Sequence, residues 1–543
     1  MRTQIAFLIL AALSVLCTMQ STGWCQGGEC DIDTVTINGN EVVYVQGQLL
    51  VKPLPGMDVR KIADELNASV SDSIPRIGWY RLMLPPNVDA AAEVQEVASL
   101  PSVEACELHG VVRQAADDLG GSAVDGDRLN CPPDPWEEIQ WPLTITRAVD
   151  AWSQVPSNSD VLISILDSGC DTDHPEYASS PRIQYGWNWY TPLGGWPEDY
   201  SGHGTHRVGE LMAPSGNGGV AGINQNCQVR VEKVTDDCSG LSFRWSPWAV
   251  AGALDYVVFE EGSRVVSISL YNATPGYDGM SAMRAAFCDV NDNAPGTVIL
   301  CCAGNDGPGV KIHYPAAWSC SLQCVIAVGG STEDDEVWPS TQFQSGDYGG
   351  QLSLLSPGEN SGSYCSTGLD GGYDADCGGT SGATAHAAGI AGMLISKHPW
   401  MVNHQIKTQL QNTSIMIPPP SGYAYDTSDC WGHPCWCIRM GSGRIDAVGA
   451  LNLRYRRQCP SFRVQAAEED FEVGLSSSGT LAHGEVSVYD LLGRKLYSQV
   501  TSNWPTNRVS ATRWLQRFED VPTGPKIVRV VTPHEVRTWR VVP

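Results

Sequence analysis

Residues 161–169, VLISILDSG, indicate the fold class of this chain. Its first six residues are almost continuously apolar, without the alternation of polar residues expected of a strand with one face in water. A strand of this kind is buried on both faces, which is typical of a parallel sheet covered by helices. Functional side chains of such sheets lie in loops beyond the carboxyl ends of the strands, where Asp167 stands.

Four more runs of the same kind follow, with helical patterns between them. Because strands and helices alternate, residues 130–455 are predicted to form an α/β domain with a parallel sheet and helices on both faces. Asn305 closely follows one of these runs, as Asp167 follows the first. The four runs are VRVEKV (229–234), RVVSISL (264–270), TVILCCA (297–303) and CVIAVGG (324–330).

The segments that flank this domain have other patterns. Residues 41–116 alternate between strand and helix signals in the order of a small β-α-β-β-α-β unit. The acidic, Gly-rich linker 117–127 is predicted to be exposed and cleavable. Within 460–543, the stretches 485–500 and 527–542 each show a strand–turn–strand pattern, which predicts a small antiparallel β domain.

Composition limits the classes of function. The 543 residues predict about three to four structural units, and a hydrophobic content of 42% is ample for a large core. The chain has 34 basic and 60 acidic residues, a formal charge of −26. So acidic a surface does not favour binding along a phosphate backbone, and nucleic acid is therefore excluded as a partner.

The first residues have the form of a secretory signal. A single Arg precedes the apolar run Ile5–Cys17, which is too short to span a bilayer, and small polar residues follow it. We therefore expect residues 1–23 to be a signal peptide cleaved near Ser21–Gly23, and the mature protein to be secreted, extracellular or at the cell surface. No other segment is predicted to cross a membrane.

Nineteen cysteines agree with export and disulfide formation. Removal of the signal peptide leaves eighteen, an even number whose pairing the sequence does not reveal. Cys301 and Cys302 lie in an apolar run and are expected to be small buried residues. The cluster Cys430, His433, Cys435 and Cys437 is either part of the disulfide framework or a zinc site, although its spacing matches no common zinc pattern.

Four short motifs supply what hydrolysis of an amide by a hydroxyl requires: a nucleophile, a base, an acid that orients the base, and oxyanion donors. Taken singly, an Asp or Asn after a strand is more often a cap, and a Ser in a Gly/Ala-rich helix is more often a packing residue. Together they predict a catalytic site. The motifs are ILDSG with Asp167, SGHGTH with His203, CAGNDG with Asn305 and GGTSGATAH with Ser381.

In this order the motifs resemble the subtilisin-like serine peptidases, and the similarity covers about 130–455. The resemblance implies that Ser381 attacks the scissile carbonyl, His203 moves the proton, and Asp167 orients His203. It implies that Asn305 and the Ser381 backbone N–H hold the oxyanion. We therefore expect a monomeric serine endopeptidase that acts on polypeptides and requires no cofactor for catalysis.

The chain departs from the family pattern after the catalytic His. Arg207 and Glu210 stand where the helix is normally apolar, so their charges must either pair or face a cleft, and they are expected to perturb His203. Gly382 and Ala385 replace the usual Met and Pro after the nucleophile, which changes packing but removes no reacting group. Arg207 and Glu210, together with Tyr271, motivate an alternative hypothesis, a catalytically inactive binding protein with the same fold.

A third departure lies in the predicted substrate-binding strand. The family's Ser-Leu-Gly is here Ser269, Leu270 and Tyr271. A tyrosine at this position is expected to narrow the pocket for the residue before the cleaved bond.

The resemblance extends to both flanking segments, and it leaves open the role of the tail and the presence of a calcium site. Residues 41–116 are similar to the inhibitory propeptides of this family, which block the cleft until they are removed. The tail, 460–543, resembles the C-terminal sorting domain of the type IX secretion route, or is a plain accessory β domain. Asp171, Asp173 and Asp199 fit either a structural calcium site or an exposed acidic turn, so no metal ligand is assigned.

Overall fold

The computed structural model describes residues 32–114, residues 140–453 and seven strands of the C-terminal segment. The predicted signal peptide, the linker 117–127 and the cluster 430–437 lie outside the described residues, as does Cys377. The chain forms two units, Met1–Asn452 and Leu453–Pro543. Inside the larger unit, the gaps are 38–39, 158, 192–193, 218, 237–242, 273–279, 344–351, 360–364, 376–377 and 419–440.

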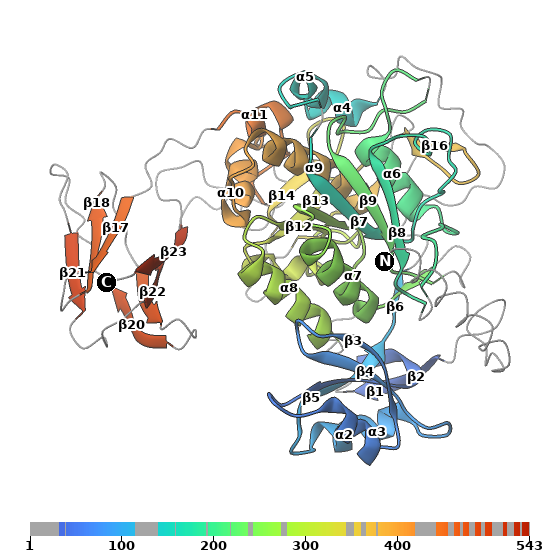
Figure 1. Cartoon of the computed structure of the whole chain (residues 1–543). Coiled ribbons are helices and arrows are strands. Elements are labelled where there is room, and N and C mark those ends of the chain that lie inside the picture. Colours follow the sequence, from blue (N-terminus) through green and yellow to red (C-terminus); the bar gives the residue numbers. More distant parts are fainter. Residues whose placement is uncertain are drawn as a thin grey trace, which may run out of the picture. The chain divides into compact units, whose positions relative to one another are not determined.

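A parallel sheet of seven strands forms the centre of the larger unit (Figure 1). Its strand order is β14-β13-β12-β11-β7-β9-β8, and every pair of neighbours is parallel, as the apolar runs predicted. The strands are β7 (Leu162–Asp167), β8 (Ile183–Asn188), β9 (Gln228–Lys233), β11 (Val265–Ile268), β12 (Val298–Cys302), β13 (Val325–Ser331) and β14 (Leu354–Pro357).

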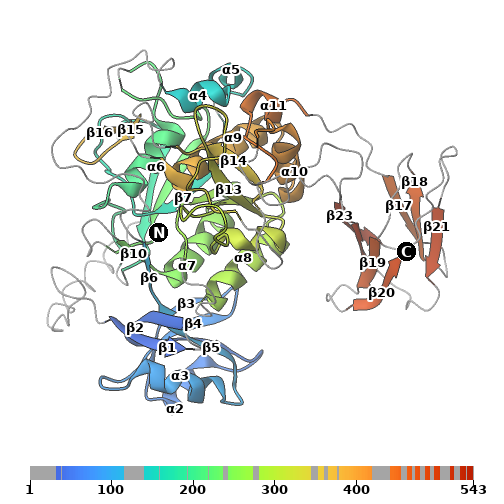
Figure 2. The ribbon, with the colours of Figure 1, turned by 180° about the vertical axis from the view of Figure 1, so that it is seen from behind.

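Helices cover both faces of this sheet, as expected. One face packs against α7 (Pro247–Phe259) and α8 (Ser281–Asn293), and the other against α6 (His203–Met212) and α9 (Gly379–Lys397) (Figures 1 and 2). Side chains of β11 alternate between the two cores: Val266 and Ile268 belong to the α7/α8 side and Val265 to the α6/α9 side. Residues on both faces are therefore apolar, which is why the strands lack polar alternation.

Shorter helices complete the unit. Those on the α9 side pack against α9 or against each other and close that core with apolar residues. They are α4 (Trp141–Ile145), α5 (Ala148–Trp152), α10 (Asn403–Thr413) and α11 (Ala447–Leu451).

Residues 32–110 form a separate small sheet with two helices on it. The predicted β-α-β-β-α-β order is confirmed, and one further strand, β1, precedes it. The sequence did not indicate β1 or β3, because β3 (SVSDSI) is mostly polar and exposed. The elements are β1 (Ile32–Ile37), β2 (Asn40–Pro53), α2 (Val59–Glu65), β3 (Ser69–Ile74), β4 (Trp79–Met83), α3 (Ala90–Ala98) and β5 (Val103–Gly110).

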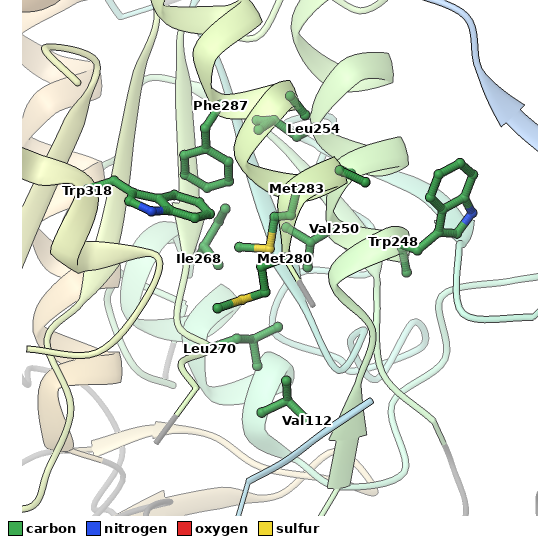
Figure 3. Packing of buried hydrophobic residues seen from close by; sticks show 14 of the residues in the cluster. Val112, Trp248, Val250, Leu254, Ile268, Leu270, Met280, Met283, Phe287 and Trp318 are labelled. Carbon is green, nitrogen blue, oxygen red and sulfur yellow. The ribbon is translucent and has the colours of Figure 1, made fainter. Parts of the chain in front are cut away.

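This small sheet docks on α7 and α8 and shares a continuous apolar core with them. Figure 3 shows part of that core, where Val250 and Leu254 of α7 lie beside Met283 and Phe287 of α8. Polar contacts also cross the interface: the indole N–H of Trp248 donates to Asp72 over 2.9 Å. The next segment, β6 (Val112–Gln114), pairs antiparallel with β10 (Phe243–Trp245) of the larger domain.

A carboxylate of the small sheet caps a helix of the larger domain. The two oxygens of Glu107 accept the backbone N–H groups of Ser281 and Ala282, over 2.9 and 3.1 Å, at the start of α8. Backbone N–H groups in the first turn of a helix have no partner within the helix, and the positive end of its dipole favours an anion. The contact therefore contributes to docking.

The C-terminal unit consists of antiparallel strands, as predicted. The predicted hairpins are found as β19 (Gly484–Tyr489) with β20 (Lys495–Thr501), and β22 (Lys526–Thr532) with β23 (Glu535–Val541). These four strands form one sheet in the order β20-β19-β22-β23. A second sheet contains β17 (Ser461–Ala466), β18 (Phe471–Ser476) and β21 (Trp514–Phe518).

Eight cysteines among the residues with described side chains are free, and five of the eight are buried. Cys301 and Cys302 are fully buried in β12, as predicted. Within the described part of the chain the free cysteines include Cys320 and Cys324, so no disulfide joins these neighbours. Among the same residues, none of the helices combines the length and the apolar character needed to cross a membrane.

Candidate active site

Three predicted site residues lie at the carboxyl ends of adjacent strands. Asp167 is the last residue of β7, Ser269 directly follows β11, and Asn305 follows β12. Because β12, β11 and β7 are neighbours in a parallel sheet, their carboxyl ends meet at one edge. The tertiary structure thus brings together residues that are 138 positions apart in the sequence (305 − 167).

His203 faces Asp167 at this edge. The imidazole Nδ1 lies 2.6 Å from Asp167 Oδ1, and both side chains are buried. Asp167 Oδ1 also accepts the backbone N–H of Ser168 over 2.7 Å. A carboxylate held in this way fixes the orientation of the imidazole ring and stabilises its protonated form.

The start of α6 positions His203 through glycines and a buried carboxylate. Gly204 packs so closely that a Cβ atom there would lie 2.1 Å from the carbonyl oxygen of Gly169, so only glycine fits. The oxygens of Asp199 accept backbone N–H groups of the loop and first turn, including Gly202 over 3.1 Å and Thr205 over 2.9 Å. Burial raises the pKa of Asp199, but the hydrogen bonds from Thr205 and Ser201 and the charge of Lys233 together outweigh burial and lower that pKa overall. The sequence pattern does not indicate this positioning role, although Asp199 lies only four residues before His203.

Ser381 lies in the first turn of α9, as expected. Its hydroxyl donates to the carbonyl oxygen of Ser269 over 3.3 Å, and the Ser269 hydroxyl donates to the carbonyl oxygen of Ser381 over 3.0 Å. Gly379, at the helix start, has φ 84°, a conformation that favours glycine. These contacts hold the start of α9 against the strand end that carries Ser269.

Asn305 contacts the same helix start. Its Oδ1 accepts the backbone N–H of Thr380 over 3.0 Å and the Thr380 hydroxyl over 2.7 Å. Because only the amide oxygen can accept a backbone N–H, these bonds fix the orientation of the amide. Asn305 therefore presents its Nδ2 donor from a defined position beside the residue that precedes Ser381.

Arg207 and Glu210 pair with each other in the protein interior. Arg207 Nη2 donates to Glu210 Oε1 over 2.7 Å, and each side chain is only 1% exposed. Burial raises the pKa of Glu210 to about 8, against the opposing effect of the Arg207 charge. Of the two arrangements considered for these charges, the structure shows pairing rather than exposure in a cleft, and this weakens the case for an inactive protein.

All three side chains of the predicted substrate strand, Ser269, Leu270 and Tyr271, are buried. Leu270 is fully buried and belongs to the core on the α7/α8 side (Figure 3). The Tyr271 ring is 2% exposed and stacks on His313, with 5.2 Å between ring centroids and 13° between planes. His313 also lies 2.9 Å from Asp306 Oδ2, so a polar and aromatic group adjoins the strand that follows β11.

Two of the three acidic residues considered for calcium are buried rather than exposed in a turn. Asp171 and Asp199 are each 4% exposed. Asp171 Oδ2 accepts the backbone N–H of Gly371 over 2.9 Å, so its carboxylate joins two loops. Within the described part of the chain, groups of three or more His, Cys, Asp or Glu side chains that could hold a metal ion do not occur.

The chain matches known protein families in two segments. Residues 158–447 match the subtilase family, and residues 32–109 match the fervidolysin N-terminal prodomain. Subtilisin E of Bacillus subtilis is 28% identical over 290 residues, which cover 52% of this chain and 67% of that protein. The major intracellular serine protease of the same species is 29% identical over 231 residues, 41% of this chain and 66% of that protein.

Solved structures show the same fold. Fervidolysin from Fervidobacterium pennivorans, a keratinolytic enzyme related to subtilisin, matches with a TM-score of 0.56 and 19% identity. That match covers 94% of this chain and 77% of fervidolysin. The epidermin leader peptide processing serine protease from Staphylococcus aureus matches with a TM-score of 0.56 and 16% identity, over 76% of this chain and 100% of its own.

The family match covers more than half of the chain, so this protein belongs to the subtilase family. It is a serine endopeptidase with an N-terminal prodomain of the fervidolysin type.

Proposed function

We propose that Asp167, His203 and Ser381 are the catalytic triad of a secreted endopeptidase that hydrolyses polypeptides. The observation that carries this proposal is the 2.6 Å contact between His203 Nδ1 and Asp167 Oδ1 at the strand edge. The start of α9, with Ser381, is tied by two hydrogen bonds to Ser269 at the same edge.

In this mechanism the Ser381 hydroxyl attacks the scissile carbonyl carbon while His203 Nε2 takes its proton. Asp167 stabilises the resulting imidazolium. Asn305 Nδ2 and the Ser381 backbone N–H donate to the oxyanion of the tetrahedral intermediate. His203 then gives the proton to the leaving amine, and an acyl-enzyme remains. Water attacks the acyl-enzyme through the same base, and Ser381 is regenerated with release of the acid product.

Substrate is proposed to lie along Ser269, Leu270 and Tyr271. A strand that ends beside Ser381 is well placed to pair with an extended polypeptide, because main-chain hydrogen bonds bind any sequence. The Tyr271 ring then restricts the pocket for the residue before the cleaved bond. No cofactor takes part in these steps.

The flanking segments are proposed to control when and where the enzyme acts. Residues 1–23 direct export, and residues 41–116 inhibit the peptidase domain, 130–455, until the chain is cut within 113–130. The pairing of β6 with β10 supports this, because it leads the chain from the prodomain onto the peptidase domain. The β domain 460–543 serves as a sorting domain, and the mature enzyme acts as a monomer outside the cell or on its surface.

A fluorophosphonate probe tests the proposed nucleophile. The processed wild-type protein is expected to be labelled and to hydrolyse casein, and Ser381→Ala is expected to lose labelling and about 10³-fold or more of its activity. Ser396→Ala, at the other end of α9, is the matched control and should keep both. Equal labelling of the Ser381→Ala protein would contradict the proposal.

The same variant tests autocatalytic maturation. If Ser381 cuts its own chain, Ser381→Ala expressed in the native host should keep the prodomain attached, visible as a larger band on a denaturing gel. Normal removal of residues 41–116 in the variant would show that another peptidase makes the cut.

A further inference from the structure

A charged pair lies on the same face of α6 as the base His203. Arg207 and Glu210 are four and seven residues after His203, and residues at i, i+4 and i+7 share one face of an α-helix. That face points inward, because His203 contacts Asp167 on β7. The pair therefore lies one and two turns along the helix from the catalytic imidazole.

The pair is out of reach of solvent and of a substrate. Each side chain is 1% exposed, and the guanidinium of Arg207 binds the carboxyl group of Glu210 over 2.7 Å. The helix packs against β7 and α9, the elements that carry Asp167 and Ser381. Any effect of the pair on hydrolysis must therefore pass through the groups around it.

Apolar residues would fill this space at a lower cost in folding free energy. Removing two charges from water is expensive, and replacing a buried ion pair by apolar residues is often neutral or stabilising. A charge in the interior does, however, act strongly on its neighbours, because the effective dielectric constant there is low. Stability alone thus gives no reason to place this pair behind the base.

Both ends of the pair are electrostatically coupled to their surroundings. Burial lowers the pKa of His386 to about 3, and the Arg207 charge contributes to that lowering. The pKa of His206 is also lowered, again mainly by burial and partly by the Arg207 charge. On the other side, the charge of Asp167 contributes to the raised pKa of Glu210.

We infer that Arg207 and Glu210 are positioning residues of the active site, which set the net charge behind His203 and thereby its strength as a base. This inference rests on the proposed role of His203.

The charges of Arg207 and Glu210 determine the direction in which each residue changes the basicity of the His203 imidazole. Arg207 is permanently positive, and a positive charge one turn away disfavours a second one on the imidazole. Below about pH 8 Glu210 is largely protonated and does not cancel that charge. Above this pH Glu210 ionises, neutralises Arg207 and favours the imidazolium formed during the reaction. Other charged or titratable groups that face this region are Asp167, Asp199, Lys233, His206, His386 and Asp374.

The test compares Arg207→Met with Arg207→Lys in the full chain that also carries Ser381→Ala. The pKa of His203 is read by NMR of ¹⁵N-labelled imidazoles, with the signal assigned by its absence in His203→Gln. Arg207→Met should raise the His203 pKa by about half a unit or more. Arg207→Lys, which keeps the charge, should leave it near the wild-type value. Because this measurement needs no hydrolysis, its outcome is independent of whether Ser381 is the nucleophile.

An unchanged or lowered His203 pKa in Arg207→Met would overturn the inference, as would equal shifts in the Met and Lys variants, which would point to packing. If Arg207→Met fails to fold, the double variant Arg207→Met/Glu210→Met replaces it, with the same upward shift expected. Arg182→Met is the matched control, since Arg182 binds the carbonyl oxygen of Met212 at the far end of α6. Its shift should be less than half as large.

Glu210→Gln separates the role of the second residue. This variant should leave the charge behind His203 unchanged below about pH 8, because Glu210 is already largely protonated there. In the active enzyme, kcat/KM of the wild type should show an additional rise near pH 8 that Glu210→Gln lacks. A rise that persists in Glu210→Gln would exclude Glu210 as its source and overturn the part of the inference that concerns it.

Discussion

The imidazole of His109, in the prodomain, lies 2.9 Å from the hydroxyl of Ser246, which caps the N-terminus of α7 in the peptidase domain. The other ring nitrogen lies 2.6 Å from Gln48 Oε1, and the side chain is buried. A titratable group thus lies in the contact between the inhibitor and the enzyme. Burial, with a smaller effect of the Arg81 charge, lowers the pKa of His109 to about 3.

Acid is therefore expected to loosen the prodomain. A released prodomain exposes His109, whose ordinary pKa is about 6.5, so the released state binds more protons below that pH. The docked state is fully favoured above pH 6.5 and loses stability as the pH falls toward 3. By linkage the loss at pH 5 is about 2 kcal/mol, a roughly 30-fold weaker association.

Gel filtration of the matured enzyme tests this expectation. The measured quantity is the fraction of cleaved prodomain that remains bound to the enzyme, compared between pH 7 and pH 5. His109→Gln keeps hydrogen-bonding capacity without a titratable ring, so its retention should differ much less between the two pH values. The same pH dependence in both proteins would assign the effect to other groups.

Asp167→Asn is expected to reduce kcat by about 10⁴-fold while the fold is retained, because an amide no longer selects the imidazole tautomer that leaves Nε2 free to accept a proton. Hydrolysis of a peptide substrate at pH 8, with circular dichroism as a check on folding, measures the effect. Asp446→Asn is the matched control: Asp446 is another buried carboxylate, which pairs with Arg147 and directly precedes α11. A loss of similar size in the control would mean that disturbed folding explains both.

Asn305→Leu is expected to lower kcat by about 10²–10³-fold with little change in KM, since the amide donates to the oxyanion only as it forms. Thr380→Val removes one of the two hydrogen bonds that orient the amide and should cause a smaller fall. Steady-state kinetics of both variants provide the comparison. An Asn305→Leu enzyme with an unchanged kcat and a raised KM would place Asn305 in substrate binding instead.

Tyr271→Gly is expected to change which residue the enzyme accepts before the cleaved bond. If the ring that stacks on His313 fills this pocket, the wild type prefers small side chains there. Its removal should raise kcat/KM for Phe or Leu relative to Ala by about 10–100-fold. Cleavage of a peptide library measures the preference, and Tyr271→Phe, which keeps the ring, should behave like the wild type. An unchanged ranking in Tyr271→Gly would show that the ring lies outside the pocket.

Prediction of the elements depended on how apolar each one is. The five predicted strands of the central sheet are found within a few residues, because their side chains are buried on both faces and carry a strong signal. The mostly polar strand 69–74 carries none, since it is stabilised by pairing with β4 rather than by burial. The hairpins 485–500 and 527–542 were predicted because both strands and turn are close in sequence.

The candidate catalytic residues could be predicted from the sequence, since Asp167, His203, Asn305 and Ser381 each stand in a short local motif. The arrangement of the charges near them follows from tertiary packing. Arg207 and Glu210 face inward because α6 is enclosed by β7 and α9, and in the interior the two side chains bind each other. Asp199 caps the first turn of α6, and His109 contacts a helix 137 residues away. Contacts of this kind depend on which surfaces meet when distant segments pack together. A local sequence pattern carries no direct information about which surfaces meet.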